Sequence, residues 1–290
     1  MKPVDAEIQL FQYLPMAFPE MSRNRLKRYL ATGRILVNGT AVVRHDYLLN
    51  RGDRVEIGPA VAGGGQRHFS SPYLRIVYED RHLFVIDKAP GILSMATSHH
   101  SFCIKDVLDD YLERTHQRCR AHVVHRLDRD TSGLMIFAKS RDVQQMFEAD
   151  WKGLVYDRRY VSVVRGRMPQ TEGTVRSWLT ETKQFFTCSS PVDNGGKLAI
   201  THYRVLQQGL DNSLVEAWLD TGRKNQIRVH FSELGAPILG DHKYGPSETD
   251  GETAAPRLFL HAYMLHFIHP VTGERLQFDT PVPAVFIKVL

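Results

Sequence analysis

The sequence predicts an α+β protein, in which a mixed, largely antiparallel sheet is flanked by helices and preceded by a small α/β domain. Short runs of alternating apolar and polar residues at 160–164, 201–205 and 214–219 are typical of antiparallel strands with one face buried. Helical periodicity is limited to a few segments. At 290 residues the chain is long enough for two domains, because single cores rarely grow beyond about 250–300 residues.

The stretch 59–72, PAVAGGGQRHFSSP, is the one clear linker in the chain. Three consecutive glycines favour a flexible connection. We therefore predict an N-terminal domain at residues 1–58, a linker at 59–72 and a second domain at 73–290. No internal repeat is visible at solenoid or propeller spacing.

A helix is predicted from Ser22, where the hydroxyl can accept hydrogen bonds from first-turn amides. Leu26, Tyr29 and Leu30 form its apolar stripe, and Gly33 can end it. The opposite face is basic and carries Arg23, Arg25, Lys27 and Arg28. Such a face is either an ordinary solvated surface or a contact for phosphate groups.

Two short strands follow at 35–43 around Asn38-Gly39, the dipeptide that most strongly favours a tight hairpin, and a third at 52–57. In the second domain, helices are predicted at 104–116, at 225–234 before Gly235, and after Ser140. The helix after Ser140 is expected to bury Val143, Met146 and Phe147.

The segment 125–140, HRLDRDTSGLMIFAKS, places a charged cluster directly before an apolar run. We predict buried strands at 121–127 and 134–138, joined by a turn at 130–133. Asp128 would then lie on a loop held at both ends, with Arg126 and Arg129 near it in sequence. Opposite charges nearby favour the ionised carboxylate. From these residues alone, Asp128 is either an active-site group or part of an ion pair at a strand end.

The same segment carries the pattern H-R-L-D-x-x-T-S-G-L followed by an apolar strand and A-K, and in this it resembles the RluA-type pseudouridine synthase family. Further matching segments occur in the family's order at 78–91, 159–166, 221–230, and 260–274. Together they cover roughly residues 74–286. The helix, LVNG hairpin and following strand near the N-terminus are similar to the RNA-binding domain of the ribosomal-protein-S-four-like type.

The resemblance implies the pseudouridine synthase fold and the conversion of uridine to its C-glycoside isomer in RNA, with no metal or organic cofactor. One persistent carboxylate is needed, either as nucleophile or as base toward a sugar proton. By resemblance this is Asp128. Arg228 matches the arginine that pairs with it, for which a bidentate fork suits better than a lysine, and Tyr160 matches the tyrosine that packs on the uracil face.

Other positions match the family with less defined roles. Arg126 matches an arginine that enters the RNA helix when the target nucleotide swings out. Two departures from the pattern are Asn225, where His is usual, and Arg159, where Lys commonly precedes the tyrosine. Supporting positions, read as structural or RNA-orienting, are Lys88, His125, Arg223, Ile227 and His261.

The implied partner is structured RNA, ribosomal RNA of the large subunit ahead of transfer RNA. The net charge of +5 suits a polyanionic partner but is also compatible with an ordinary enzyme. Three cysteines without paired spacing favour a reducing compartment and suggest neither disulfides nor a zinc site. We expect a cytoplasmic monomer that does not enter membranes. A non-catalytic ribosome-assembly factor and an unrelated hydrolase remain the competing interpretations.

Overall fold

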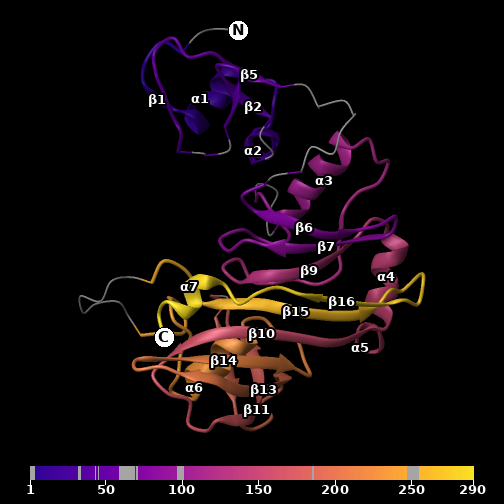
Figure 1. The fold of residues 1–290 in the computed structure, drawn as a ribbon, viewed down its shortest axis with the longest axis vertical. Helices are drawn as coiled ribbons and strands as arrows, with labels where there is room; N and C mark the ends of the chain where they lie inside the picture. Colours follow the sequence, from indigo (N-terminus) through magenta and orange to yellow (C-terminus); the bar gives the residue numbers. More distant parts are fainter. Residues whose placement is uncertain are drawn as a thin grey trace. The chain divides into compact units, whose positions relative to one another are not determined.

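The computed structural model describes residues 4–31, 34–42, 44, 46–58, 69, 71–96, 101–184, 186–246 and 255–290. The chain forms two compact units. Unit 1 contains Met1–Leu127 and Met135–Ala149, and unit 2 contains Asp128–Leu134 and Asp150–Leu290. Figure 1 labels the helices and most of the strands. The predicted boundaries at 58 and 73 stay a prediction, because most of the linker, 59–68 and 70, lies outside the described residues.

The N-terminal part of unit 1 has a core of its own, built from eleven buried side chains: Val4, Leu10, Leu14, Leu26, Tyr29, Leu30, Ile35, Val37, Val42, Leu49 and Val55. Its strands form a pair, β1-β4, and a three-stranded sheet in the order β3-β2-β5. The elements are β1 (Ile8–Gln9), α1 (Leu10–Ala17), α2 (Arg23–Ala31), β2 (Ile35–Val37), β3 (Thr40–Ala41), β4 (Leu48–Leu49) and β5 (Val55–Ile57).

The predicted helix and hairpin of this part are confirmed. The Ser22 hydroxyl accepts a hydrogen bond from the Arg25 N–H at 3.3 Å, so it caps α2. The hairpin turns at Asn38 and Gly39, whose φ angles of 52° and 81° are those of a tight two-residue turn. The predicted helix stop, Gly33, lies outside the described residues.

The rest of unit 1 contains a second antiparallel pair and two helices. In this unit β7 lies between β6 and the later residues of β9, and β8 pairs with β9. The elements are β6 (Leu74–Glu79), β7 (Leu83–Lys88), α3 (Ile104–Arg114), β8 (His122–Val123), the end of β9 (Ser132–Ala138) and α4 (Arg141–Ala149).

Two expectations for this region were wrong in part. The strand predicted at 121–127 is only two residues long. Beyond it, the Ile136 N–H of β9 donates to the side chain of His125, at Nε2 and 3.0 Å, and the Leu127 N–H donates to the Ser94 hydroxyl, so these bonds are not those of a strand ladder. In α4, Val143 and Phe147 are buried, but Met146 is 43% exposed. The predicted apolar stripe is therefore narrower than expected.

Unit 2 is a sheet in the order β12-β11-β13-β14-β10-β15, with β16 also paired to β15. All these pairs are antiparallel, and a parallel pair joins β15 to the start of β9. The predicted mixed, largely antiparallel sheet is confirmed. The elements are α5 (Trp151–Leu154), β10 (Val155–Arg165), β11 (Glu172–Glu181), β12 (Thr187–Ser190), β13 (Lys197–Gln208), β14 (Asn212–Leu219), α6 (Gln226–Glu233), β15 (Leu260–Ile268), β16 (Arg275–Asp279) and α7 (Ala284–Ile287).

The start of β9 explains the glycine after Asp128. Ser132 and Gly133 were expected in a turn, but they already pair with His261 and Ala262 of β15. Gly133 has φ +118°, and a Cβ there would lie 2.2 Å from the Ala262 carbonyl oxygen. Only glycine allows the two strands to approach so closely.

Helix α6 packs on β12 and β13 (Figure 1). It matches the helix predicted at 225–234, and Gly235 follows it with φ +73°. Among the described residues, no helix is long and apolar enough to span a membrane.

Candidate active site

Asp128 lies directly after a residue whose backbone is fixed by a side chain. The Ser94 hydroxyl donates to the Leu127 carbonyl at 2.7 Å and accepts from the Leu127 N–H at 3.1 Å. Ser94 and Leu127 are both buried. On the other side of Asp128, Arg129 pairs with Asp130 at 3.1 Å. The peptide group that precedes Asp128 therefore has little freedom to rotate, which limits the positions of its carboxylate.

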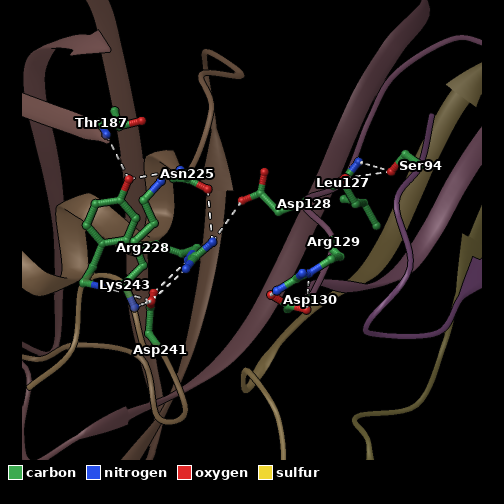
Figure 2. A network of polar contacts seen from close by, with 11 residues as sticks. Ser94, Leu127, Asp128, Arg129, Asp130, Thr187, Asn225, Arg228, Asp241 and Lys243 are labelled. Atoms are coloured by element: carbon green, nitrogen blue, oxygen red, sulfur yellow. Dashed lines mark hydrogen bonds and ion pairs between the residues drawn. The ribbon is translucent and has the colours of Figure 1, made fainter. Parts of the chain in front are cut away.

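Arg228 of α6 faces Asp128 across 3.7 Å between Nη1 and Oδ2 (Figure 2). This distance is that of an ion pair and exceeds that of a hydrogen bond. The side chains are 11% and 21% exposed, so the pair is only partly screened by water. The predicted pairing is therefore present, although the predicted bidentate geometry belongs to a different carboxylate.

That carboxylate is Asp241, which the sequence analysis did not identify. Arg228 donates from Nε to Oδ2 and from Nη2 to Oδ1, both at 2.7 Å, in the bidentate geometry that holds a guanidinium most firmly. Asp241 is fully buried as a side chain and also accepts the N–H groups of Lys243 and Tyr244 at 2.9 and 3.1 Å. Figure 2 shows Arg228 held between Asp241 and Asp128.

Asn225 completes the set of partners around Arg228. It precedes α6 in the left-handed conformation, with φ 55°, and its Oδ1 accepts from Arg228 Nη1 at 3.1 Å. Its Nδ2 donates to the Tyr244 hydroxyl at 3.0 Å, and the Thr187 N–H donates to the same hydroxyl at 3.1 Å. The amide of Asn225, which stands where His is usual, thus bridges Arg228 and Tyr244 through two hydrogen bonds.

The pKa values of Asp241 and Arg228 are both shifted so that the charged form of each group is favoured. Burial alone would raise the pKa of Asp241, but the hydrogen bonds and charge of Arg228 outweigh it and leave this pKa below its usual value. Burial likewise opposes the charge of Arg228, yet Asp241 and Asp128 keep its pKa raised. Both groups are therefore charged at neutral pH, and one guanidinium faces two carboxylates.

Tyr160 lies on the sheet face that carries α6. It sits opposite Ala217, which in turn sits opposite Tyr203, so the three side chains share one face. The Tyr203 ring meets Phe231 of α6 edge-on, with ring centroids 5.9 Å apart. Tyr160 is only 7% exposed. The register thus places Tyr160 and the helix of Arg228 on the same side of the sheet.

His261 joins β15 to β9 as a neutral ring. Nδ1 lies 2.7 Å from the Ser132 hydroxyl and Nε2 lies 3.0 Å from the Thr280 hydroxyl. Burial, and secondarily the charge of Arg257, lowers the pKa of His261 to about 4. Arg257 also donates to Ser132 at 2.6 Å. Neutral and fully bonded, His261 has the contacts of a structural residue.

The other supporting residues are placed as follows. Lys88 is 1% exposed and its Nζ donates to the carbonyls of Ala89 and Ile92 at 2.8 and 2.9 Å, so it fixes the loop after β7. Arg223 is exposed and donates to the Leu198 carbonyl at 3.0 Å. Ile227 is buried in α6, and Arg126 is exposed in unit 1.

The basic residues of α2 differ in their exposure and in their contacts. Arg23 and Arg25 are exposed, and Lys27 is half-buried. Arg25 donates to the Tyr29 hydroxyl at 2.8 Å, and the Lys27 ammonium lies 5.5 Å from the centre of the Phe11 ring. The side chain of Arg28 lies outside the described residues.

The family model for RNA pseudouridylate synthases matches residues 82–233 of this chain. The chain is 33% identical to "Ribosomal large subunit pseudouridine synthase D" of Pseudomonas aeruginosa, with 97% of this chain and 91% of the relative covered. It is 36% identical to the Bacillus subtilis protein "Uncharacterized RNA pseudouridine synthase YjbO", with 89% and 90% covered. The chain belongs to the RNA pseudouridylate synthase family. It is an isomerase that converts uridine to pseudouridine in RNA.

A solved structure agrees with this membership. The human "RNA Pseudouridylate Synthase Domain Containing 4" superposes with a TM-score of 0.58 at 27% identity, covering 73% of this chain and 90% of that one. The segment matched by the family model contains Asp128, Tyr160 and Arg228, whereas Asp241 lies after its end.

The sequence of this synthase contains a signal for a carboxylate near Arg228, but the signal does not specify the pairing with Asp241. The arginine predicted on a largely apolar helix has to be balanced by a carboxylate if it is buried. Gly240-Asp241 follows the short apolar run 237–239, where a turn can place a buried carboxylate beside the helix.

In the part of the chain that the structure describes, no three His, Cys, Asp or Glu side chains group as metal ligands.

Proposed function

We propose that this pseudouridine synthase acts on large-subunit ribosomal RNA and that Asp128, Tyr160 and Arg228 form its active site. The proposal rests on the placement of Asp128 within 3.7 Å of Arg228. Relatives over nearly the whole chain that carry the name ribosomal large subunit pseudouridine synthase D support the choice of substrate. We propose that the enzyme is a monomer and that it acts in the cytoplasm, where ribosomal RNA is assembled.

In the proposed mechanism the N-glycosidic bond of the target uridine breaks, the base turns over, and carbon five of the base bonds to the sugar. The hydrogen on carbon five then leaves. Asp128 acts on the sugar, either as the nucleophile or as the base. Arg228 favours the ionised carboxylate and fixes its position. The fork to Asp241 supports this role, because it leaves Arg228 little freedom to move.

Tyr160 is proposed to pack against the uracil ring, and the family position of its hydroxyl makes it the group that assists loss of the proton from carbon five. Its place on the face that carries α6 supports this role. Arg126 is proposed to enter the RNA when the uridine swings out, which its exposure permits.

Residues 1–58 are proposed as an RNA-binding domain of the ribosomal-protein-S-four-like type. The separate core of this part and the exposed Arg23 and Arg25 on α2 support it. Contacts from such residues to phosphates would add affinity without reading sequence.

The experiment that tests the proposed function measures hydrogen release from carbon five of labelled uridine, in ribosomal and transfer RNA separately. We expect release from ribosomal RNA by the wild type and none by Asp128→Asn, with RNA binding intact. Asp130→Asn is the matched control, since it makes the same change two residues away in the exposed ion pair with Arg129. Release from transfer RNA alone would overturn the substrate, and full activity of Asp128→Asn would overturn the catalyst.

A further inference from the structure

An exposed aromatic ring, that of Phe186, is separated from Arg228 by a single side chain, that of Tyr244. Phe186, directly before β12, is 40% exposed. Its ring centroid is 4.8 Å from that of Tyr244, and the planes are tilted by 53°. The Tyr244 ring in turn has the Arg228 guanidinium 5.2 Å from its centre. Phe186, Tyr244 and Arg228 thus form a continuous row of contacts from solvent to the candidate active site.

Hydrogen bonds and packing hold both Phe186 and Tyr244 in place. The hairpin that carries Phe186 is closed by two bonds, from the Thr182 N–H to the Phe186 carbonyl at 2.8 Å and from the Phe186 N–H to the Thr182 hydroxyl at 3.2 Å. Tyr244 accepts from Asn225 and Thr187 and packs against the apolar cluster of Leu179, Ala199 and Val229. An exposed ring with such support is already in position and loses little entropy on binding.

The charge around the ring is positive. The Lys243 ammonium lies 5.3 Å from the centre of the Phe186 ring and 5.4 Å from that of Tyr244. Lys183 is exposed at the tip of the same hairpin. Of the nearby carboxylates that the structure describes, Glu181 pairs with Lys224 and Asp241 pairs with Arg228. These cations are suited to a phosphate group.

We propose that Phe186, backed by Tyr244 and flanked by Lys243, is a stacking subsite for an unpaired nucleotide of the RNA substrate next to the target uridine. This inference rests on the proposed function. A base would lie on the exposed face of Phe186 and its phosphate near Lys243. Stacking on an aromatic ring accepts any base, so the subsite gives affinity and position and does not read sequence.

The test compares Phe186→Leu, which keeps an apolar side chain without a π face, with Phe186→Trp, which keeps the π face. The substrate is the RNA fraction that the wild type modifies. Loss of one stacked base should raise the KM of Phe186→Leu about tenfold and leave kcat unchanged. Phe186→Trp should stay within about twofold of the wild type. Lys243→Gln should reduce the dependence of RNA binding on salt.

Tyr156→Leu is the matched control. This tyrosine is also exposed, at 42%, and also has an arginine near its ring, Arg275 at 5.8 Å, but it lies near the start of β10 and contacts Gln277 of β16 rather than β12. Its KM should not change. An unchanged KM for Phe186→Leu, or a fall in kcat instead, would overturn the subsite and show that the ring only covers Tyr244.

Different results would overturn the proposed function and the stacking subsite. A wild type that releases no hydrogen from either RNA would overturn the proposed function. Filter-binding measurements with ribosomal RNA on the same variants would still test the subsite, because Phe186→Leu should bind about tenfold more weakly than Phe186→Trp. Equal binding by these two variants, at equal thermal stability, would overturn the subsite while leaving the proposed function standing.

Discussion

At the scale of single residues, the candidate active site depends on a carboxylate that is not expected to touch the substrate. Asp241 binds Arg228 through two hydrogen bonds of 2.7 Å, whereas Asp128 meets the same guanidinium at 3.7 Å. Asp241 therefore sets the position of Arg228, and Arg228 sets the electrostatic surroundings of Asp128. A shorter, bidentate contact to Asp128 would have used the oxygen atoms that the proposed chemistry requires.

This division of roles predicts the effect of Asp241→Asn. Removing the charge of Asp241 leaves the buried guanidinium of Arg228 with only the longer ion pair to Asp128, so the free energy of unfolding should fall by about 3 kcal/mol. Misplacement of Arg228 should lower kcat about a hundredfold with little change in KM. Urea unfolding and steady-state hydrogen release measure the two effects.

The control for this prediction is Asp220→Asn, the same substitution in a contact of 3.1 Å with the His202 ring, where the Asp220 side chain is 52% exposed. Its cost should stay below about 1 kcal/mol. If Asp241→Asn were as stable and as active as this control, the fork to Arg228 would have no role in holding the site.

At the scale of elements, local sequence signals predicted those features that local chemistry determines. The Asn38-Gly39 hairpin, the Ser22 cap and the stop of α6 at Gly235 each follow from the preferences of one or two residues. The turn expected at 130–133 was wrong in its second half, because a pairing between β9 and β15 draws Ser132 and Gly133 into a strand. Such long-range pairing leaves no mark in a short window of sequence.

The same limit applies to the candidate site. The H-R-L-D pattern pointed to Asp128 and the matching segment 221–230 pointed to Arg228, but the fork to Asp241 joins residues thirteen positions apart across a turn. The bidentate geometry was therefore assigned to the wrong carboxylate. Phe186 carries no motif, and it is distinguished from other exposed apolar residues by its contacts in space with Tyr244 and Lys243.

The close approach of β9 and β15 predicts the effect of Gly133→Ala. A Cβ at Gly133 would lie 2.2 Å from a backbone oxygen that cannot move away without breaking the strand pair. The strain and the positive φ together should cost more than about 3 kcal/mol. Gly273→Ala is the control, because Gly273 has φ +73° but nothing within 4 Å of the added Cβ. A cost near 1 to 2 kcal/mol is expected there. Equal midpoints in chemical unfolding would contradict the role given to Gly133.

The buried His230 on helix α6 should lower the stability of unit 2 in acid. This fully buried ring bonds to the hydroxyls of Ser177 and Thr201 at 2.9 and 2.8 Å, and burial lowers its pKa to about 4. Between pH 6.5 and 4 the unfolded chain binds a proton at this position that the folded chain does not, so stability falls as the pH falls through this range. The full contribution, about 3 kcal/mol, is present above pH 6.5.

His230→Gln keeps polar atoms near both hydroxyls but cannot titrate. The free energy of unfolding of this variant, measured in urea at a series of pH values, should therefore change less steeply between pH 6.5 and 4 than that of the wild type. A slope equal to that of the wild type would show that other groups cause the acid sensitivity.

At the scale of the whole molecule, the chain combines two kinds of proposed RNA contact. The α2 helix offers the exposed cations Arg23 and Arg25, which suit backbone phosphates and give affinity that depends on salt. The site around Asp128 and Arg228 is partly buried and offers fixed geometry, which suits one nucleotide taken out of the stack. Affinity and chemistry should therefore be separable by substitution.

Replacing Arg23, Arg25 and Lys27 together by Gln tests this separation. If each contacts a phosphate, the slope of log K against log salt concentration for RNA binding should become shallower by about 2, since each phosphate contact contributes about 0.7 to 0.9. The kcat for hydrogen release at saturating RNA should not change, because none of the three belongs to the proposed active site. The control removes two charges from the same part of unit 1, Arg51→Gln with Arg54→Gln, beside β5 rather than on α2. An unchanged slope for the α2 variant, or an equal loss in the control, would mean that the total charge of this part and not the face of α2 governs binding.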